Sequence, residues 1–435
     1  MEVLGYDVLI VGSGVAGLFA ALNIKENLKV LIVTKKSLKD CNSYLAQGGV
    51  SVQKNDDDFE SFLEDTLKAG KYKNNKDAVS LMINSSRQII SDLIDLGVEF
   101  DKDGEKLRYT KEGAHSEFRI VHYKDITGKE IIDKLVQNVL ERKNIEIRED
   151  SVMTDLIVEN KKCTGIKVIE NGKEINYLAH NTILATGGIG GMFDNSTNYR
   201  HITGDGVNVA LNNNIDCKDL NYIQIHPTAL YTEGKNRRFL ISESLRGEGA
   251  YLLNNKAERF VDELLPRDVV SKAIFEEFKK TGERNVYLSF NHRGVDFVKE
   301  RFPNIYARCK EAGYILGEDS IPVAPAQHYF MGGITINKNG KTSLSNLYAV
   351  GETSCVGIHG ENRLASNSLL EGLVFSKRAA RDINQRSLID EKQEETIKKD
   401  EALREIEKTK LKLSDIKFRE IVEKGNKEFY DKWFR

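Results

Sequence analysis

The sequence has little cysteine, little proline and no large excess of charge of either sign. Lysine and arginine number 64 against 66 aspartates and glutamates, so the charge balance predicts no nucleic-acid partner. The cysteines are scattered, odd in number and never arranged as a CxxC pair, which argues against a disulfide framework, and we predict no metal site. They are Cys41, Cys163, Cys217, Cys309 and Cys355.

Long apolar runs are missing as well. No stretch approaches the ~18 apolar residues of a membrane helix, and the first predicted strand begins after five residues, which leaves no room for a signal peptide. We therefore expect a cytoplasmic protein without a membrane partner. The 435 residues are enough for two or three domains. All five prolines fall between Ile223 and Ala326, which sets that segment apart.

The N-terminal segment carries a dinucleotide-binding pattern. An apolar run, a glycine-rich turn, a predicted helix and a second apolar strand follow one another at residues 7–11, Gly12-x-Gly14-x-x-Gly17, 18–25 and 30–34. The first glycine permits a tight turn, the second lets the backbone approach a pyrophosphate, and the third lets the helix pack on the strand. The helix N-terminus adds free N–H groups for the phosphates. The pattern predicts a nucleotide site.

An acidic residue at the end of the second strand is absent. In nicotinamide-binding proteins such a residue bonds the ribose, but this chain has Thr34-Lys35-Lys36 there. Nicotinamide is therefore disfavoured. FAD remains as the predicted cofactor, because its adenosine can be held by other groups, including Lys35.

Further elements follow from hydrophobic periodicity and turn signals. Predicted helices cover residues 58–67, 77–96, 267–280 and 368–385. Predicted strands cover Asp155–Glu159, Cys163–Glu170, Glu174–Ala179, Thr182–Ala185 and Leu347–Val350, with Asn171-Gly172 as a hairpin turn. The strand at 182–185 is expected to return beside the first strand of the chain.

These elements predict an α/β fold: a Rossmann-like FAD-binding domain, an inserted α+β capping domain and a short C-terminal helical tail. The FAD-binding domain is expected in two parts, at residues 1–222 and 331–387, around a capping domain at residues 223–330. Residues 388–435 are rich in Glu and Lys, with pairs such as Glu394 and Lys398 at helical spacing. We expect a solvated helix or a small helical hairpin there.

Dense polar motifs occur along the chain. They are Ala46-Gln47-Gly48-Gly49, Thr203-Gly204-Asp205-Gly206, Gln224-Ile-His226-Pro-Thr228, Ser242-Glu-Ser-Leu-Arg246-Gly-Glu248-Gly249, Pro266-Arg267-Asp268 and His359-Gly-Glu-Asn362-Arg363-Leu-Ala-Ser366-Asn-Ser368. In this order, over residues 7–385, they resemble the flavoprotein superfamily of succinate dehydrogenase and fumarate reductase. Within it the resemblance is greatest to the L-aspartate oxidases, because of Lys111-Glu112-Gly-Ala-His115-Ser116 and Ala326-Gln-His328-Tyr329.

The resemblance implies that FAD is bound noncovalently. The histidine that carries the flavin in succinate dehydrogenase falls at Asn42, five residues before Gln47. The implied cofactor-binding residues are those of the glycine-rich turn, a lysine, one loop and four later positions. They are Gly12, Ser13, Gly14, Val15, Ala16, Gly17, Lys35, Asn42, Ser43, Tyr44, Leu45, Ala46, Gln47, Gly48, Gly49, Asp205, Glu352, Ser368 and Leu369.

The resemblance also implies a reaction. L-aspartate would be oxidised to iminosuccinate by hydride transfer to flavin N5, and dioxygen or fumarate would reoxidise the flavin. This is the first step of de novo NAD biosynthesis, whose product passes to quinolinate synthase. Aspartate carries two carboxylates and one ammonium, so its site needs cationic donors and one acceptor.

The candidate residues match those chemical types. Arg363 can clamp a carboxylate through two parallel hydrogen bonds, and His226, His328 and Ser242 can donate to it. By resemblance, Arg267 is the catalytic arginine that exchanges a proton with the substrate. Glu112 would face the amino group and penalise succinate, which leaves the acid unpaired.

Other interpretations are open for single residues. His226 alone is more often a structural histidine, Glu112 in a polar loop is usually solvated, and Arg267 could pair with Asp262 or Glu263. Arg246 and Glu248 could form a structural pair, so neither is included among the catalytic residues.

Other functions remain open too. The alternative enzyme is a soluble fumarate reductase or succinate dehydrogenase-like flavoprotein. A flavoprotein subunit of a membrane electron-transfer complex and a noncatalytic FAD-binding module are further candidates. Two departures from the family pattern stand out: Ser242 occupies a position that is often threonine, and the C-terminal helical segment is short.

Overall fold

The computed structural model describes residues 3–234 and 236–394. Its centre is a seven-stranded sheet in the order β8-β2-β1-β11-β10-β9, with β18 also paired to β11. The strands are β1 (Val3–Val11), β2 (Val30–Val33), β8 (Ile145–Arg148), β9 (Ser151–Glu159), β10 (Lys162–Glu170), β11 (Lys173–Leu184) and β18 (Leu347–Ala349). The pairs among β8, β2, β1, β11 and β18 are parallel. The predicted return beside the first strand is confirmed, because β11 pairs with β1.

The long strand β11 corrects one prediction. Two strands were predicted, at Glu174–Ala179 and Thr182–Ala185, but they form one strand. Asn181 does not interrupt the strand, since it pairs with Val8 of β1. One edge of β11 pairs antiparallel with β10 over residues 173–178 and parallel with β18 over residues 182–184. This strand therefore joins the antiparallel meander to the parallel sheet.

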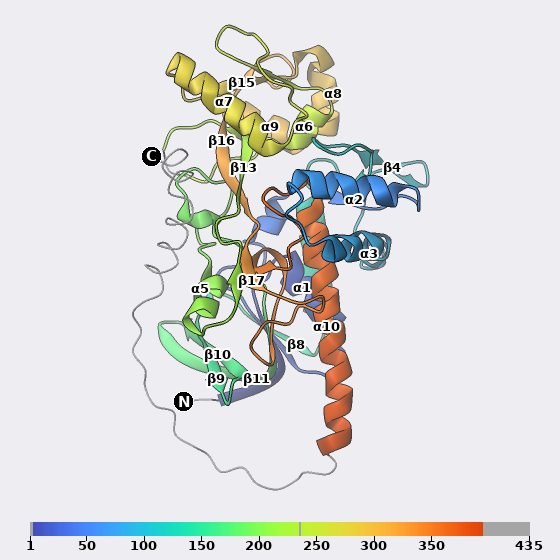
Figure 1. Cartoon of the computed structure of the whole chain (residues 1–435), viewed down its shortest axis with the longest axis vertical. Helices are drawn as coiled ribbons and strands as arrows, with labels where there is room; N and C mark the ends of the chain where they lie inside the picture. Colours follow the sequence, from blue (N-terminus) through green and yellow to red (C-terminus); the bar gives the residue numbers. More distant parts are fainter. Residues whose placement is uncertain (1–2, 235, 395–435) are drawn as a thin grey trace.

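Helices cover the sheet and bury its apolar side chains. They are α1 (Val15–Asn23), α2 (Asp58–Ala69), α3 (Lys76–Asp95), α4 (Thr127–Glu141), α5 (Asp205–Asn212) and α10 (Asn367–Glu394). Helix α1 packs against α10 and α4, and Figure 1 shows α10 as the long helix along one side of the molecule. Helix α1 begins at Val15, before the predicted Leu18, because Gly14 at its N-cap is still extended. The Asn75 side chain caps α3 by accepting a hydrogen bond from the N–H of Ala78.

Short strands extend this layer towards the site. The pairs form three small sheets: β3 (Val50–Ser51) with β7 (Ile120–Val121) and β6 (Tyr109–Thr110); β4 (Lys102–Asp103) with β5 (Lys106–Leu107); and β12 (Cys217–Lys218) with β17 (Gly333–Thr335) and β19 (Ser354–Cys355). In the first, β6 and β7 form a hairpin whose loop is residues 111–119. This loop carries Glu112.

A second unit, which we call the cap unit, comprises residues 223–330 and lies at one end of the molecule (Figure 1). Its sheet has the order β13-β16-β15-β14. Its elements are β13 (Ile223–Leu230), α6 (Glu243–Gly247), β14 (Tyr251–Leu253), α7 (Arg267–Thr281), β15 (Val286–Ser289), α8 (Gly294–Arg301), α9 (Pro303–Glu311) and β16 (Ile321–Phe330). It has a hydrophobic cluster of its own, which includes Leu252, Phe290 and Phe302. The exact division into domains stays a prediction.

The chain returns to the first unit at β18, and α10 runs to Glu394. Helix α10 therefore crosses the predicted boundary at residue 387. The rest of the predicted helical tail, with the Glu394 and Lys398 pair, lies outside the described residues. None of the helices in the described ranges combines the length and apolar character that a membrane crossing requires.

Candidate active site

The glycine-rich turn leaves a backbone surface free of side chains. Gly12 has φ of 110°, and a Cβ there would collide with the carbonyl of Ala185 at the end of β11. Gly17 packs so tightly on the carbonyl of Gly12 that it has no room for a side chain. The N-terminus of α1 therefore lies open above the ends of β1 and β11, where an anionic group is favoured.

A cavity of about 620 Å³ starts at this turn and reaches the cap unit. That volume lies within the usual range for small-molecule sites. Every predicted cofactor, substrate and catalytic residue lines it except Gly17, which packs behind the turn. The structure therefore brings these residues to one cavity, while their individual roles stay predictions.

Lys35 is engaged at the nucleotide end of the cavity. Its ammonium lies 2.9 Å from the carboxylate of Asp205 and donates 3.0 Å hydrogen bonds to Thr203 Oγ1 and the His201 carbonyl. Lys35 and Asp205 are both partly exposed. The two residues therefore line the cavity as an ion pair, which their spacing in the sequence did not reveal.

The loop at residues 42–49 forms one wall. Residues 42–45 form a short 3₁₀ turn, η1 (Asn42–Leu45), and Ser43 Oγ accepts a hydrogen bond from the N–H of Val15 at the start of α1. The Asn42 side chain donates to Asn198 and accepts from the N–H of Tyr199. An amide in this position fills a structural role and offers no nucleophile for a covalent flavin bond.

Glu352 lies half-buried in the cavity wall. Its Oε1 accepts a hydrogen bond from the N–H of Phe330, and Gly188 leaves room for its side chain. Burial raises the pKa of Glu352 to about 7. The carboxyl group is therefore poised to bond a ligand hydroxyl.

Two histidines face each other at the cap side, with ring centroids 5.1 Å apart. His226 Nδ1 accepts from the N–H of Thr228, so its Nε2 carries the proton; that atom is buried without a partner among the described residues. His328 Nδ1 lies 2.8 Å from Thr197 Oγ1. Burial, with Arg267 nearby, moves the pKa of both rings well below the ordinary value. Both rings are neutral, and the Nε2–H of His226 is free to donate.

Arg363 lies four residues before the start of α10 at Asn367. It donates a 2.7 Å hydrogen bond to Ser368 and lies 4.4 Å from the ring centroid of Tyr329. Its Nε is buried without a partner in the described part of the chain. Burial, reinforced by the Arg267 charge, lowers the pKa of Arg363 to about 10, which still leaves it cationic at neutral pH.

Arg267 opens α7 and does not pair with Asp262 or Glu263. Its Nε donates 2.5 Å to Glu243 and its NH1 donates 2.8 Å to Gln224. Burial raises the pKa of Glu243, but Arg267 and Arg246 outweigh it, so the net pKa lies below the ordinary value. Glu243 is therefore ionised between two arginines, and its other oxygen lies 3.4 Å from Arg246.

The suggested pair of Arg246 and Glu248 is not formed. Arg246 donates to the Glu263 carbonyl and lies next to Glu243, whereas Glu248 pairs with Arg301 at 2.8 Å. Glu243 and Gln224 are the site residues that sequence reasoning missed. Both lie inside motifs named above: Glu243 follows Ser242 directly, and Gln224 stands two residues before His226. Their spacing in the sequence did not indicate that they contact Arg267.

Glu112 is buried, not solvated. Its two oxygens accept hydrogen bonds from Ser244 (2.9 Å) and Ser366 (2.5 Å). A Cβ on Gly48 would lie 2.5 Å from Glu112 Oε1, so the carboxylate occupies space that this glycine of the 42–49 loop leaves open. Glu112 thus adds a carboxylate to a cavity whose lining also includes Arg267, Arg363 and two histidines.

Comparison with known proteins decides the family. The FAD binding domain family matches residues 7–369. The L-aspartate oxidase of Clostridium perfringens is 58% identical, over 87% of this chain and 86% of that protein, and that of Clostridium acetobutylicum is 53% identical, over 87% and 88%. The chain belongs to the L-aspartate oxidase family. Among solved structures, an E. coli quinol fumarate reductase superposes with a TM-score of 0.84 at 29% identity, covering 90% of this chain and 72% of that one.

Members of the family differ in the amount of chain outside the match. The Synechocystis L-aspartate oxidase is 42% identical over 85% of this chain, but the match covers only 69% of that protein. For the two clostridial proteins, the match covers 86% and 88% of the relative.

Proposed function

We propose that this protein oxidises L-aspartate to iminosuccinate with noncovalent FAD, as the first step of de novo NAD biosynthesis. The observation that carries the proposal is Glu112. The cavity lining also holds Glu243, but that carboxylate is already paired with Arg267 and Arg246. Among the described residues, buried Glu112 is bonded only to two hydroxyls, and the same cavity offers Arg363 and two neutral histidines to a substrate's carboxylates. A substrate with two carboxylates and one ammonium matches that arrangement, whereas a plain dicarboxylate leaves Glu112 without a cationic partner.

The residues present suit FAD. The open backbone at Gly12, the free N-terminus of α1 and the carboxyl of Glu352 provide places for a pyrophosphate and for hydroxyl groups. Ser368 and Leu369 lie in the first turn of α10 and line the same cavity. When bound, FAD supplies an acceptor for a hydride.

The chain's own residues bind and orient the substrate. Arg363 holds one carboxylate, assisted by the Nε2–H of His226, and His328 and Ser242 line the same part of the cavity. Glu112 accepts hydrogen bonds from the amino group. It is also the group placed to take the proton that the ammonium must lose before Cα–H can leave as hydride. The oxidation removes that hydride and leaves a C=N bond.

Arg267 is assigned to the second half-reaction, in which the reduced flavin is reoxidised. If fumarate reoxidises the flavin, a carbon of fumarate must receive a proton as well as a hydride. Arg267 lines the cavity and is bonded to Glu243, which is buried and ionised. We propose that Arg267 gives this proton, that the Glu243 carboxylate holds and stabilises the guanidinium, and that a proton from solvent restores the guanidinium afterwards. Dioxygen is the other proposed acceptor.

A soluble fumarate reductase is the second candidate. The observation that favours it is the same cluster of Arg267, Arg363, His226 and His328, which suits any four-carbon dicarboxylate. Glu112 argues against it as the main activity. We further propose a cytoplasmic location and transfer of the product to quinolinate synthase.

The test is anaerobic reduction of the purified yellow protein, followed through the flavin absorbance. Bleaching by L-aspartate but not by succinate, with recovery on adding fumarate or air, is the expected result. Bleaching by succinate, or by neither compound, would overturn the proposal and favour the fumarate reductase.

A further inference from the structure

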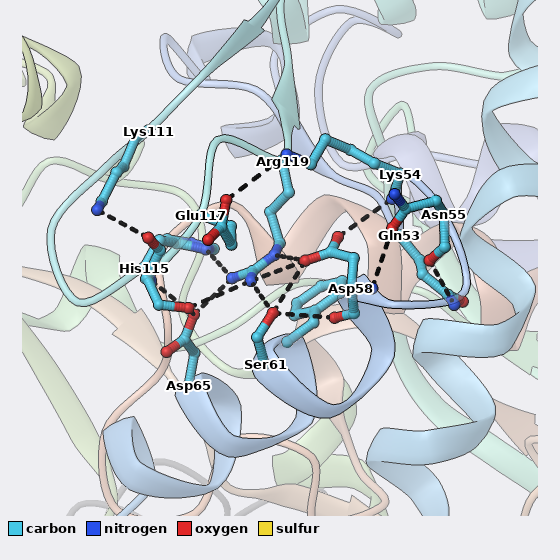
Figure 2. Close-up of polar contacts among 12 residues, drawn as sticks. Gln53, Lys54, Asn55, Asp58, Ser61, Asp65, Lys111, His115, Glu117 and Arg119 are labelled. Atoms are coloured by element: carbon cyan, nitrogen blue, oxygen red, sulfur yellow. Dashed lines mark hydrogen bonds and ion pairs between the residues drawn. The ribbon is translucent and has the colours of Figure 1, made fainter.

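A buried polar cluster outside the cavity lies behind the Glu112 loop, residues 111–119. At its centre is Arg119, the last residue of the loop, whose side chain has no exposure to solvent. Figure 2 shows its guanidinium surrounded by side chains of α2 and of the loop itself. Neither Arg119 nor the partners described below line the cavity. Their contacts therefore concern the loop and not the ligand directly.

Helix α2 supplies the anionic partners. Arg119 donates to Asp58 through Nε (3.1 Å) and NH2 (2.9 Å), and to Asp65 through NH1 (2.5 Å). NH2 also donates to Ser61 Oγ at 2.7 Å. Positions 58, 61 and 65 are spaced so that they share one helix face. A buried arginine with these partners is satisfied, so it holds a single position.

Asp65 binds the loop a second time. Its Oδ2 also accepts hydrogen bonds from the backbone N–H and the hydroxyl of Ser116, both at 2.7 Å. Ser116 is four residues from Glu112. The loop is therefore fastened to α2 at Ser116 and at Arg119.

His115 carries this restraint towards the cavity. Arg119 NH1 lies 3.2 Å from His115 Nδ1, and because an arginine can only donate, Nδ1 is the acceptor. The proton of the ring is then on Nε2, which donates a 3.0 Å hydrogen bond to the Ala365 carbonyl. The next residue, Ser366, donates its hydroxyl to Glu112. The chain of contacts thus ends at the carboxylate itself.

The other side of the loop touches the cap unit. The N–H of Ala114 donates to the Leu264 carbonyl, and Gly113 packs against Glu243. Ala114 has φ of 64°, in the left-handed region that alanine rarely occupies. The loop holds this conformation only while contacts on both sides persist.

We propose that Arg119, fastened by Asp58 and Asp65 and acting through His115, is a positioning residue that sets the specificity of the enzyme for a substrate with an amino group. The inference rests on the proposed function, because it assigns Glu112 to the amine. It adds that recognition of the amine depends on α2, a helix that contributes no residue to the cavity wall.

The test uses Asp65→Asn, which keeps the shape of the side chain and removes its charge. Ser116→Ala is a milder second variant, since it removes one donor to Asp65. We expect the KM for L-aspartate to rise about tenfold in Asp65→Asn and severalfold in Ser116→Ala, with kcat within about twofold. Succinate has no amine, so its dissociation constant, read from the flavin spectrum, should stay within about twofold.

The matched control is Glu117→Gln. Glu117 lies in the same loop and loses the same charge, but it is exposed and its contact with Lys54 is 3.7 Å long. Its KM for L-aspartate should equal that of the wild type. Unchanged KM in both test variants, or equal weakening of L-aspartate and succinate, would overturn the inference, because the second result is general loosening of the site.

Failure of the proposed function looks different. It appears in the wild type as a flavin that L-aspartate does not bleach, whereas failure of this inference appears only in the variants. Hydrogen exchange of residues 111–119 gives a readout that needs no substrate. Exchange in Asp65→Asn should be faster than in Glu117→Gln, and equal rates would show that Asp65 does not hold the loop.

Discussion

Arg119 and Arg363 are both buried, yet their surroundings differ. Arg119 has two carboxylates, a hydroxyl and an imidazole around it. Arg363 has one hydroxyl and an aromatic face, and no carboxylate of the described residues lies within ion-pair distance of it. Burying an unpaired charge is costly. A protein that bears this cost at a cavity wall leaves the cation for a ligand, whereas the fully paired arginine supports the architecture.

The largest expected effect compares Arg363→Met with Arg119→Met. Removing Arg363 should lower kcat/KM for L-aspartate about a thousandfold or more, because the carboxylate clamp is lost. It should leave the free energy of unfolding of the FAD-free protein unchanged or higher, because an unpaired buried charge disappears. Arg119→Met should instead destabilise by about 3–5 kcal/mol, since it leaves Asp58 unpaired. Steady-state kinetics measures the loss of activity, and chemical denaturation measures the free energy of unfolding of both variants. Equal stability of the two variants would show that the two arginines do not differ in the way described.

The next largest effect is expected for Glu243→Gln, which should lower the rate of fumarate reduction about a hundredfold. The amide keeps the shape next to Arg267 but lacks the charge that stabilises the guanidinium. Aspartate oxidation under excess dioxygen should fall much less, because it needs no proton on carbon. The two half-reactions are separated by stopped-flow measurement, and an equal loss in both would assign Glu243 to binding alone.

The raised pKa of Glu352 predicts that the free energy of unfolding of the FAD-free protein depends on pH. Its pKa is raised by burial from 4.5 to about 7 in the folded chain. The folded state therefore binds the proton more tightly, so this contribution to stability is full below pH 4.5 and is lost as pH rises through 7. Its size is roughly 2–3 kcal/mol. Denaturation of wild type and Glu352→Gln at several pH values should show this decline only in the wild type.

Glu112→Gln should lower kcat/KM for L-aspartate about twentyfold while tightening the binding of succinate. The amide no longer attracts the ammonium and no longer penalises a CH2 group. Binding of succinate is read from the flavin spectrum. Unchanged preference for L-aspartate would show that the amine is recognised elsewhere.

The smallest effect concerns Ser242. Its hydroxyl accepts from the N–H of Ser244 and caps α6. Threonine supplies the same hydroxyl, so Ser242→Thr should change kcat/KM by no more than about twofold. Ser242→Ala is the informative partner, since it removes both the cap and the donor; kinetics and thermal unfolding of the pair separate the two roles.

Much of the fold followed from local pattern. The βαβ unit, the meander and helices α3, α7 and α10 were predicted because strands and amphipathic helices have periodic sequences. Local sequence pattern does not show where one strand continues through polar residues. The prediction divided β11 in two because nothing in the local sequence indicates that Asn181 pairs with Val8. The start of α1 was misplaced because apolar residues already begin the helix at Val15.

Motifs identified the residues of the cavity but not their partners. Resemblance gave Arg267, whereas its contact with Glu243 depends on how α6 and α7 meet in the cap unit. The cluster around Arg119 joins residues up to 61 positions apart in the chain. Hydrogen bonds of that kind have no sequence period, so only the folded structure reveals them.

The discontinuous sheet also determines when the protein becomes able to hold its cofactor. Gly12 meets Ala185 just after β11, β11 pairs with β18 at residues 347–349, and α10 packs against α1, the helix that follows the glycine-rich turn. At roughly 5–20 residues per second, a ribosome needs about 20–70 s between the glycine-rich turn and β18. The cap unit is synthesised within that interval and has its own hydrophobic cluster. During synthesis it can fold before the nucleotide cradle is finished, so FAD binds a nearly complete chain.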